Sequence, residues 1–123
     1  MCLITNNTRK YIAEKDIVCY KVANIRDEGI TSYWFDFIYE LNKKYTTQVL
    51  QPIPAPNGSI RIEEGFHSYR NLYTAKKELY YSLMELLPTV IIKCIVPKGS
   101  EYYIDSDSDE MVSNQIIIVE KCV

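Results

Sequence analysis

The chain has 123 residues, of which 47% are hydrophobic and 24% are charged, and this average composition excludes a disordered tail, a collagen-like chain and a membrane protein. The 14 Lys and Arg residues are scattered and do not outnumber the 16 Asp and Glu residues, which argues against duplex nucleic acid as a partner, because phosphate binding needs a basic surplus. A single His excludes any chemistry that needs two imidazoles. A chain of this length is expected to form a single domain over residues 1–123.

The four cysteines, Cys2, Cys19, Cys94 and Cys122, are expected to be reduced. No two of them form the close pair that a structural zinc site needs. Cys19 and Cys94 lie in apolar runs and are predicted to be small buried residues. Because the sequence shows neither a basic, apolar leader nor an apolar run long enough to cross a bilayer, we expect a cytoplasmic protein with no membrane partner.

The first part of the chain is predicted to form strands after one helical turn. Residues 11–16 suit a short N-terminal helical turn, and residues 17–22 are β-branched and aromatic, as in a buried strand. Residues 33–41 alternate with a period of two, which is typical of a strand. Residues 45–50 are predicted to return beside them as a hairpin, with a turn at residues 42–44.

The middle of the chain combines a proline-rich loop with the predicted helix. Alternate prolines make residues 52–58 an extended loop, and residues 60–62 and 65–69 are predicted to be a short strand pair. Apolar residues then recur at spacings of three and four, which predicts one long amphipathic helix over about residues 71–87. Asn71 is a suitable N-cap for it.

The last part of the chain is predicted to form strands again. Residues 89–96 are a strongly apolar strand, residues 101–104 continue as an extended segment, and residues 115–119 are the final strand. Residues 105–110 are an acidic, solvated loop. Strands on both sides of one long helix indicate an α+β fold with a mainly antiparallel sheet.

The acidic loop partly resembles a calcium-binding loop. Asp105, Asp107 and Asp109 occupy its first, third and fifth positions. Glu110, however, stands where the turn glycine belongs, and Ile116 stands where the last Glu ligand belongs. No metal site is therefore predicted.

Tyrosine dominates the aromatic residues, with 11 Tyr against three Phe and one Trp, and spacing divides the tyrosines into two groups. Strand or helix spacing predicts core positions for Tyr20, Tyr33, Tyr39, Tyr73 and Tyr80. Tyr69, Tyr81, Tyr102 and Tyr103 are predicted to lie beside loops or on solvent-exposed faces.

The segment order in the C-terminal half resembles the later half of the ADP-ribosyltransferase-like fold. The likeness rests on residues 65–69, on Ala75 in the predicted helix, on the apolar run and turn at residues 89–100, and on a last apolar strand. In that family a polar strand precedes a helix that carries Ala, and then follow an apolar strand ending in Pro-x-Gly and a strand that a catalytic Glu opens. Residues 20–22 match the family's first strand, which carries Arg or His for the NAD pyrophosphate or ribose.

Three departures from this pattern count against transferase activity. Lys21 replaces the Arg or His, residues 67–69 (His-Ser-Tyr) replace Ser-Thr-Ser, and residues 113–115 (Ser-Asn-Gln) stand where Glu-x-Glu is expected. Gln cannot supply the negative charge that stabilises an oxocarbenium-like ribose. The resemblance thus implies binding of an NAD- or ADP-ribose-type ligand, and no other cofactor.

The whole chain is similar to small proteins of gut-bacterial phages and mobile elements. The shared stretches are residues 1–5, 20–22, 65–69 and 97–103. This likeness implies an accessory role in phage or mobile-element biology and no particular reaction.

We therefore expect a non-catalytic binding protein that holds a small nucleotide-derived ligand or a host protein in a cleft rich in amphipathic tyrosines. The residues expected to line the cleft are Tyr20, Lys21, His67, Ser68, Tyr69 and Gln115. Two alternatives remain open. One is a divergent ADP-ribosyltransferase or NAD-cleaving enzyme that uses Glu101 or Glu120, and the other is a structural module that self-associates through Tyr33, Phe35 and Phe37.

Overall fold

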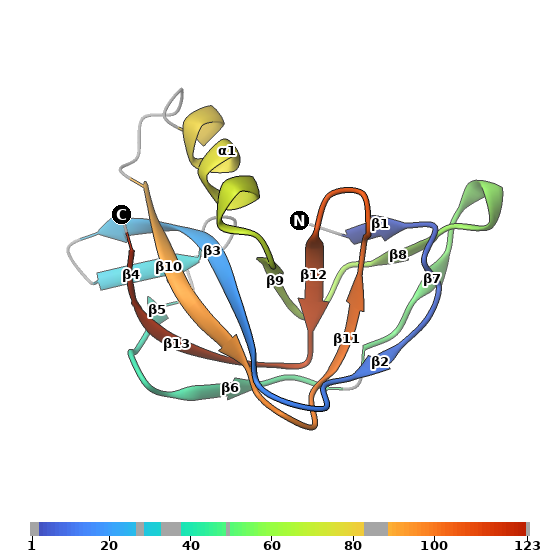
Figure 1. Ribbon diagram of the computed structural model, residues 1–123, viewed down its shortest axis with the longest axis horizontal. Coiled ribbons are helices and arrows are strands. Elements are labelled where there is room, and N and C mark those ends of the chain that lie inside the picture. Colours follow the sequence, from blue (N-terminus) through green and yellow to red (C-terminus); the bar gives the residue numbers. More distant parts are fainter. Residues whose placement is uncertain (1–2, 27–28, 33–37, 49, 83–88, 123) are drawn as a thin grey trace.

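A computed structural model describes residues 3–26, 29–32, 38–48, 50–82 and 89–122, and the statements below concern these residues. Strands make up 53% of the described residues and helix 10%, so the fold is mainly antiparallel β-sheet with one short helix. Figure 1 shows the large sheet with the helix on one side of its centre and a smaller sheet at one end.

The large sheet contains ten strands, and every pair of neighbours within it is antiparallel. Eight of them form a continuous path, which in spatial order is β2 (Tyr11–Ile12), β11 (Glu101–Ile104), β12 (Glu110–Ser113), β9 (Phe66–Tyr69), β3 (Ile17–Arg26), β10 (Thr89–Val96), β13 (Gln115–Lys121) and β6 (Lys44–Thr46). Off this path, β4 (Gly29–Ser32) pairs with β3, and β5 (Ile38–Tyr39) pairs with β4.

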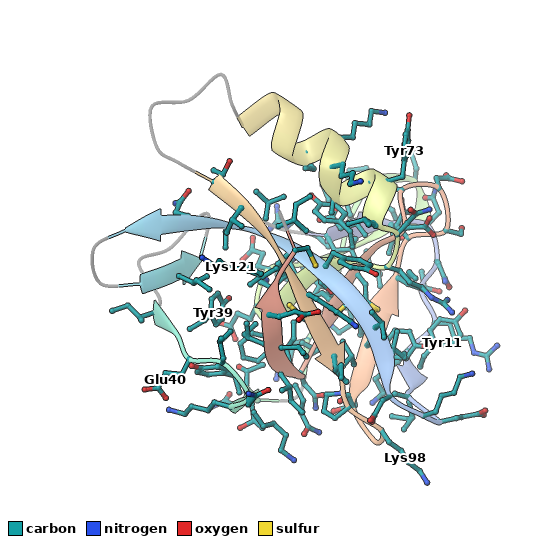
Figure 2. All side chains as sticks on the ribbon, turned by 60° about the vertical axis from the view of Figure 1, so that its left-hand side comes forward. Tyr11, Tyr39, Glu40, Tyr73, Lys98 and Lys121 are labelled. Atoms are coloured by element: carbon teal, nitrogen blue, oxygen red, sulfur yellow. The ribbon has the colours of Figure 1, made fainter. Side chains whose placement is uncertain are left out.

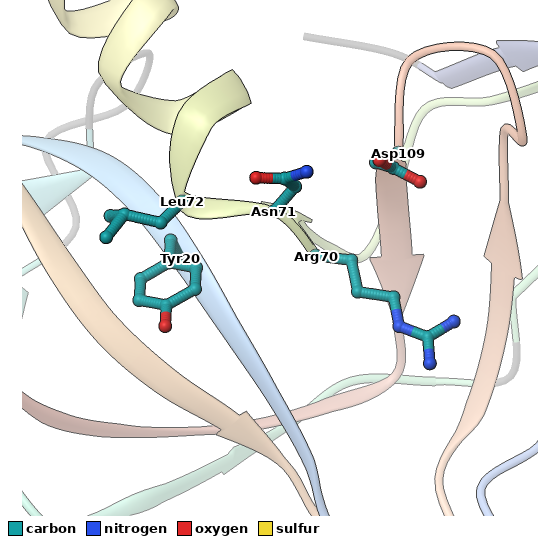
Figure 3. Close-up of a pocket in the computed structure, with 5 residues that line it drawn as sticks. All are labelled: Tyr20, Arg70, Asn71, Leu72 and Asp109. Carbon is teal, nitrogen blue, oxygen red and sulfur yellow. The ribbon is translucent and has the colours of Figure 1, made fainter.

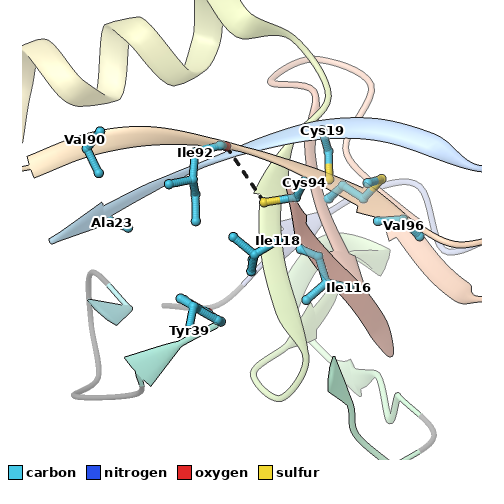
Figure 4. Packing of buried hydrophobic residues seen from close by; sticks show 10 residues of the cluster. Cys19, Ala23, Tyr39, Val90, Ile92, Cys94, Val96, Ile116 and Ile118 are labelled. Carbon is cyan, nitrogen blue, oxygen red and sulfur yellow. Dashed lines mark hydrogen bonds between the residues drawn. The ribbon is translucent and has the colours of Figure 1, made fainter. Parts of the chain in front are cut away.

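Strands β3 and β10 form the centre of the large sheet because both are long, apolar and β-branched. Their register runs without interruption from Thr89 opposite Asn24 to Val96 opposite Ile17. Alternate side chains on the two strands face away from the helix and build the main core cluster, together with Ile116 and Ile118 of β13 (Figure 4). The strand predictions for residues 17–22, 89–96, 101–104 and 115–119 are therefore confirmed.

The smaller sheet packs a second apolar cluster against the end of the large one. It consists of β1 (Leu3–Thr5), β8 (Ile60–Ile62) and β7 (Ile53–Pro54), and a 3-10 turn at Pro56–Gly58 joins the last two. Leu3 and Ile62 from this sheet are buried with Leu50, and with Tyr103 and Val112 of β11 and β12.

Helix α1 (Leu72–Ser82) covers β3, β10 and β9 on the face opposite the main core cluster. Asn71 caps its start, because the Asn71 Oδ1 accepts the backbone N–H of Tyr73 at 2.8 Å, as its sequence position predicts. Ala75 is fully buried against Tyr69 and Ile91, with Tyr20 and Leu72 packed around them. The predicted helix end near residue 87 lies outside the described residues.

The predicted helical turn at residues 11–16 is wrong. Tyr11 and Ile12 form β2, which pairs with β11, and the Tyr11 ring stacks on Tyr102 with 5.4 Å between ring centroids. Ala13 then exchanges backbone hydrogen bonds with Ser100 and Gly99. The chain stays extended here because the sheet edge supplies backbone partners that a single helical turn lacks.

The two predicted strand pairs between residues 33 and 69 are also wrong in their partners. β5 pairs with β4 and β6 pairs with β13, although the chain turns between them at Asn42, whose φ is 60°. β8 pairs with β1 and β7, whereas β9 pairs with β12 and β3. Residues 33–37 and 49 lie outside the described residues.

Burial corrects part of the division of the tyrosines. Tyr39 is buried as predicted. Tyr69 and Tyr103, which were expected beside loops or on solvent-exposed faces, are buried too. Tyr73, expected in the core, is 72% exposed and projects from the outer side of the helix (Figure 2). Ala75 takes the place against the sheet in this part of the helix, so the neighbouring face that carries Tyr73 meets solvent.

Candidate functional site

Five of the six predicted site residues lie on the adjacent strands β3 and β9, but on both faces of the sheet. Tyr20 of β3 and Tyr69 of β9 are directly opposite each other in the register. Both side chains belong to the cluster beneath α1. The structure thus brings these two residues together on the helix-covered face.

Lys21 and Ser68 point to the opposite face, because neighbouring side chains on a strand alternate. The Lys21 ammonium group donates a hydrogen bond to the carbonyl oxygen of His67 and lies 5.9 Å from the centre of the Tyr39 ring. Its side chain is only 8% exposed, and Ser68 is buried opposite Met111 of the main core cluster. These two polar residues therefore sit within the core side of the sheet.

His67 lies on the same face of β9 as Tyr69, two residues along the strand, whereas Gln115 lies on a more distant strand. His67 stands opposite Val112, and its Nε2 is 3.3 Å from the carbonyl oxygen of Glu63. Burial lowers the pKa of His67 from 6.5 to about 4, so the imidazole is neutral at pH 7, and its Nδ1 has no hydrogen-bond partner among the described residues. Gln115 stands opposite Thr46 on β13, which β10 separates from β3.

A shallow pocket of about 410 Å³ lies at the start of α1, and we call it the helix-side pocket (Figure 3). Tyr20 and Leu72 lie together on one side, Asp109 lies on the other, and Arg70 and Asn71 lie between them. The Arg70 backbone N–H donates to the carbonyl oxygen of Asp109 at 3.0 Å, which ties the two sides together. Tyr20 is the sequence-predicted residue in this lining.

Glu110 is a residue at this end of the sheet that sequence reasoning missed. It opens β12 next to Asp109 and stands directly opposite Tyr69, which in turn stands opposite Tyr20. Burial, and then the carboxylates of Glu78 and Asp105, raise the pKa of Glu110 from 4.5 to about 7. Its Oε1 is buried without a hydrogen-bond partner among the described residues. A carboxylate placed directly before the apolar pair Met111-Val112 is the one sequence signal for it.

The acidic loop is held by its own first residue. The Asp105 Oδ1 accepts from the Thr5 hydroxyl at 2.9 Å, and its Oδ2 accepts from the Ser108 hydroxyl at 2.9 Å. The bond from Thr5 anchors the loop to β1 of the smaller sheet. Within the described ranges, no group of three or more His, Cys, Asp and Glu side chains is arranged to hold a metal ion.

The residues of the two alternative functions lie elsewhere. Glu101 forms a 2.7 Å ion pair with Lys10 and accepts a 3.2 Å hydrogen bond from the Asn114 amide. Glu120 is exposed opposite Lys93 near the end of β13. Tyr33, Phe35 and Phe37, expected to mediate self-association, lie outside the described residues.

The raised pKa of Glu110 predicts a pH-dependent stability. The folded-state pKa of Glu110, about 7, exceeds the ordinary value of 4.5. Its contribution to the free energy of unfolding is therefore fully present below pH 4.5 and is lost as the pH rises to about 7. His67 has the opposite sign: its lowered pKa makes stability rise between about pH 4 and 6.5. Glu110→Gln removes the pH dependence caused by Glu110 and leaves that caused by His67.

When the pH is raised from 4.5 to 8, the free energy of unfolding of the wild type should fall relative to that of Glu110→Gln by about 1–2 kcal/mol. This value includes a reduction for partial solvent screening.

Urea denaturation of both proteins at the two pH values measures this difference. Glu63→Gln is the matched control, because Glu63 is an exposed glutamate, and it should follow the wild type. A stability difference between wild type and Glu110→Gln that is the same at both pH values would contradict the prediction.

No protein-family model, no curated protein and no solved structure matches this sequence. Among the described residues, no helix has the length and apolar character needed to cross a bilayer.

Proposed function

We propose that the chain is a non-catalytic binding protein that holds a nucleotide-derived ligand, such as ADP-ribose or NAD, in the helix-side pocket. The observation that carries this proposal is that an aromatic residue, Tyr20, a basic residue, Arg70, and an acidic residue, Asp109, line the same pocket. A nucleotide offers a base for the ring, phosphates for the guanidinium and ribose hydroxyls for the carboxylate. Lys21 and Ser68 then support the sheet beneath the ligand from its other face.

We also propose that the fold is ADP-ribosyltransferase-like, and the strand order supports this. The strand assigned to the family's first strand is β3, and it lies between β9, the polar strand, and β10, the apolar strand that follows the helix. The last apolar strand of the resemblance is β13, which Gln115 opens in place of a glutamate and which lies beside β10. The segments that carry the sequence resemblance are thus neighbours in one sheet, which a shared ligand site requires.

The biological setting remains the one that the sequence likeness implies. We propose an accessory role for the protein in phage or mobile-element biology, in the cytoplasm of the host. A host protein is the alternative partner, and it becomes the favoured one if no nucleotide derivative binds.

Calorimetric titration with ADP-ribose and with NAD tests the binding proposal. Arg70→Gln should weaken the binding of either ligand by about tenfold or more, because it removes a charge-assisted hydrogen bond worth about 1.5–3 kcal/mol. Arg61→Gln is the matched control, since Arg61 is an exposed arginine on β8 that pairs with Glu63 at 3.2 Å, and it should bind like the wild type. Absence of heat with both ligands, or equal weakening by the two substitutions, would overturn the proposal.

Glu110 favours a second candidate function, an NAD-cleaving enzyme. Its carboxyl lies in a row with Tyr69 and Tyr20, and a pKa of about 7 leaves part of it ionised at neutral pH. An anion held in a partly dry site can stabilise the positive ribose that forms when the nicotinamide–ribose bond breaks. Release of nicotinamide from NAD, abolished by Glu110→Gln and retained by Glu63→Gln, would select this candidate, whereas intact NAD would select the binding protein.

A further inference from the structure

Two buried thiols face each other across the two central strands. Cys19 of β3 and Cys94 of β10 are directly opposite in the register, both are 0% exposed, and both are free. They lie on the same face of the sheet within the main core cluster (Figure 4). Neither residue takes part in the proposed ligand site, so their chemistry needs a separate explanation.

The register brings the two thiols close to bonding geometry. Directly opposite residues of an antiparallel pair have Cβ atoms about 4.5–5.5 Å apart, and a disulfide joins Cβ atoms about 3.5–4.5 Å apart. A shift of about 1 Å between the strands is enough to close the gap. We propose that Cys19 and Cys94 form a redox-active dithiol, which a hydroperoxide such as hydrogen peroxide converts into a cross-strand disulfide.

The surroundings give the two sulfur atoms different roles. The hydrogen bond from the Cys94 thiol lowers the pKa of Cys19, and the charge of Lys21, two residues along the same strand face, acts in the same direction. Burial raises the pKa of Cys94 well above its ordinary value. The Lys21 ammonium lies on the same strand and the same face as Cys19 and can stabilise a thiolate there, and the thiolate is the reactive form, so Cys19 is the attacking residue and Cys94 is the resolving one.

The reaction balances in two steps. The Cys19 thiolate attacks one oxygen of hydrogen peroxide, the O–O bond breaks, and the departing hydroxide takes a proton to become water, which leaves a sulfenic acid on Cys19. The Cys94 sulfur then attacks the Cys19 sulfur, forms the S–S bond and releases the second water with its own proton. Two thiols are oxidised and one peroxide is reduced.

The test uses the full chain with Cys2→Ser and Cys122→Ser, so that only the two core thiols remain. The folded protein is treated with hydrogen peroxide, then unfolded in an alkylating reagent and weighed by mass spectrometry. We expect a product that has lost two hydrogen atoms, takes up no alkyl group and yields a peptide linking residues 19 and 94. Dithiothreitol should restore both alkylation sites. Full alkylation of both cysteines after peroxide treatment, or added oxygen without the link, would overturn the proposal.

A single-thiol variant checks the order of the steps. With Cys94→Ser added to the same background, Cys19 should stop at the sulfenic acid, which dimedone traps. With Cys19→Ser instead, the slower, buried Cys94 should give little or no dimedone product. Equal trapping in both variants would overturn the assignment of Cys19 as the attacking residue, and the measurement on the two-thiol protein stands even if either variant fails to fold.

Discussion

Ile92→Ala should lower the free energy of unfolding by about 3–4 kcal/mol. Ile92 is 0% exposed and lies on β10 between β3 and β13, opposite Lys21 on one side and Lys121 on the other. Its side chain belongs to the main core cluster, where hydrogen-bonded strands on both sides prevent the gap from closing. The substitution therefore removes buried apolar surface and leaves a cavity. Urea denaturation followed by far-ultraviolet circular dichroism measures the change.

Ile4→Ala is the control with identical chemistry at the surface. Ile4 also lies on a strand, but its side chain is 59% exposed on β1 of the smaller sheet. We expect the control to lose no more than about 0.5 kcal/mol. Similar losses for the two substitutions would show that Ile92 does not occupy the core position assigned to it.

The sequence predicts well those strands whose own residue composition is enough to indicate a strand. β3 and β10 are largely apolar and rich in β-branched residues, and the main core cluster covers one of their faces while α1 packs on the other. Partner choice is different, since it depends on contacts far apart in the chain. β8 and β9 are neighbours in sequence, and for that reason they were predicted to pair. In the structure β8 belongs to the smaller sheet instead, where its Ile62 is buried with Leu3.

In the candidate site, too, features set by neighbouring residues can be predicted from the sequence, and features set by distant segments cannot. Once residues 20–22 and 67–69 are strands, alternation alone separates Tyr20 from Lys21 and Ser68 from Tyr69. That step was available from the sequence. The position of Glu110 beside Tyr69 was not, because it depends on β12 returning next to β9 after the whole of α1 and β10.

Gly65→Ala should destabilise the protein strongly. Gly65 has a φ of 125° at the point where the chain leaves the smaller sheet to enter β9. An added Cβ would lie 2.6 Å from the Val112 Cγ2, 2.7 Å from the Leu50 Cδ2 and 3.1 Å from the Ser113 carbonyl oxygen. Val112 and Leu50 are buried in the second apolar cluster, so they can move away only by disturbing it. We expect a loss of about 3–5 kcal/mol, from backbone strain and overpacking together.

Gly29→Ala separates these two causes. Gly29 has nearly the same φ, 127°, but an added Cβ there meets no atom of the described residues within 4 Å. The control therefore carries the backbone strain without the collision and should lose about 1–2 kcal/mol. The difference between the two variants, measured by urea denaturation, reports the collision with Val112 and Leu50. Equal losses would mean that Val112 and Leu50 can move away from the added Cβ at no cost. The junction between the two sheets would then be less tightly packed than the positions of these two residues indicate.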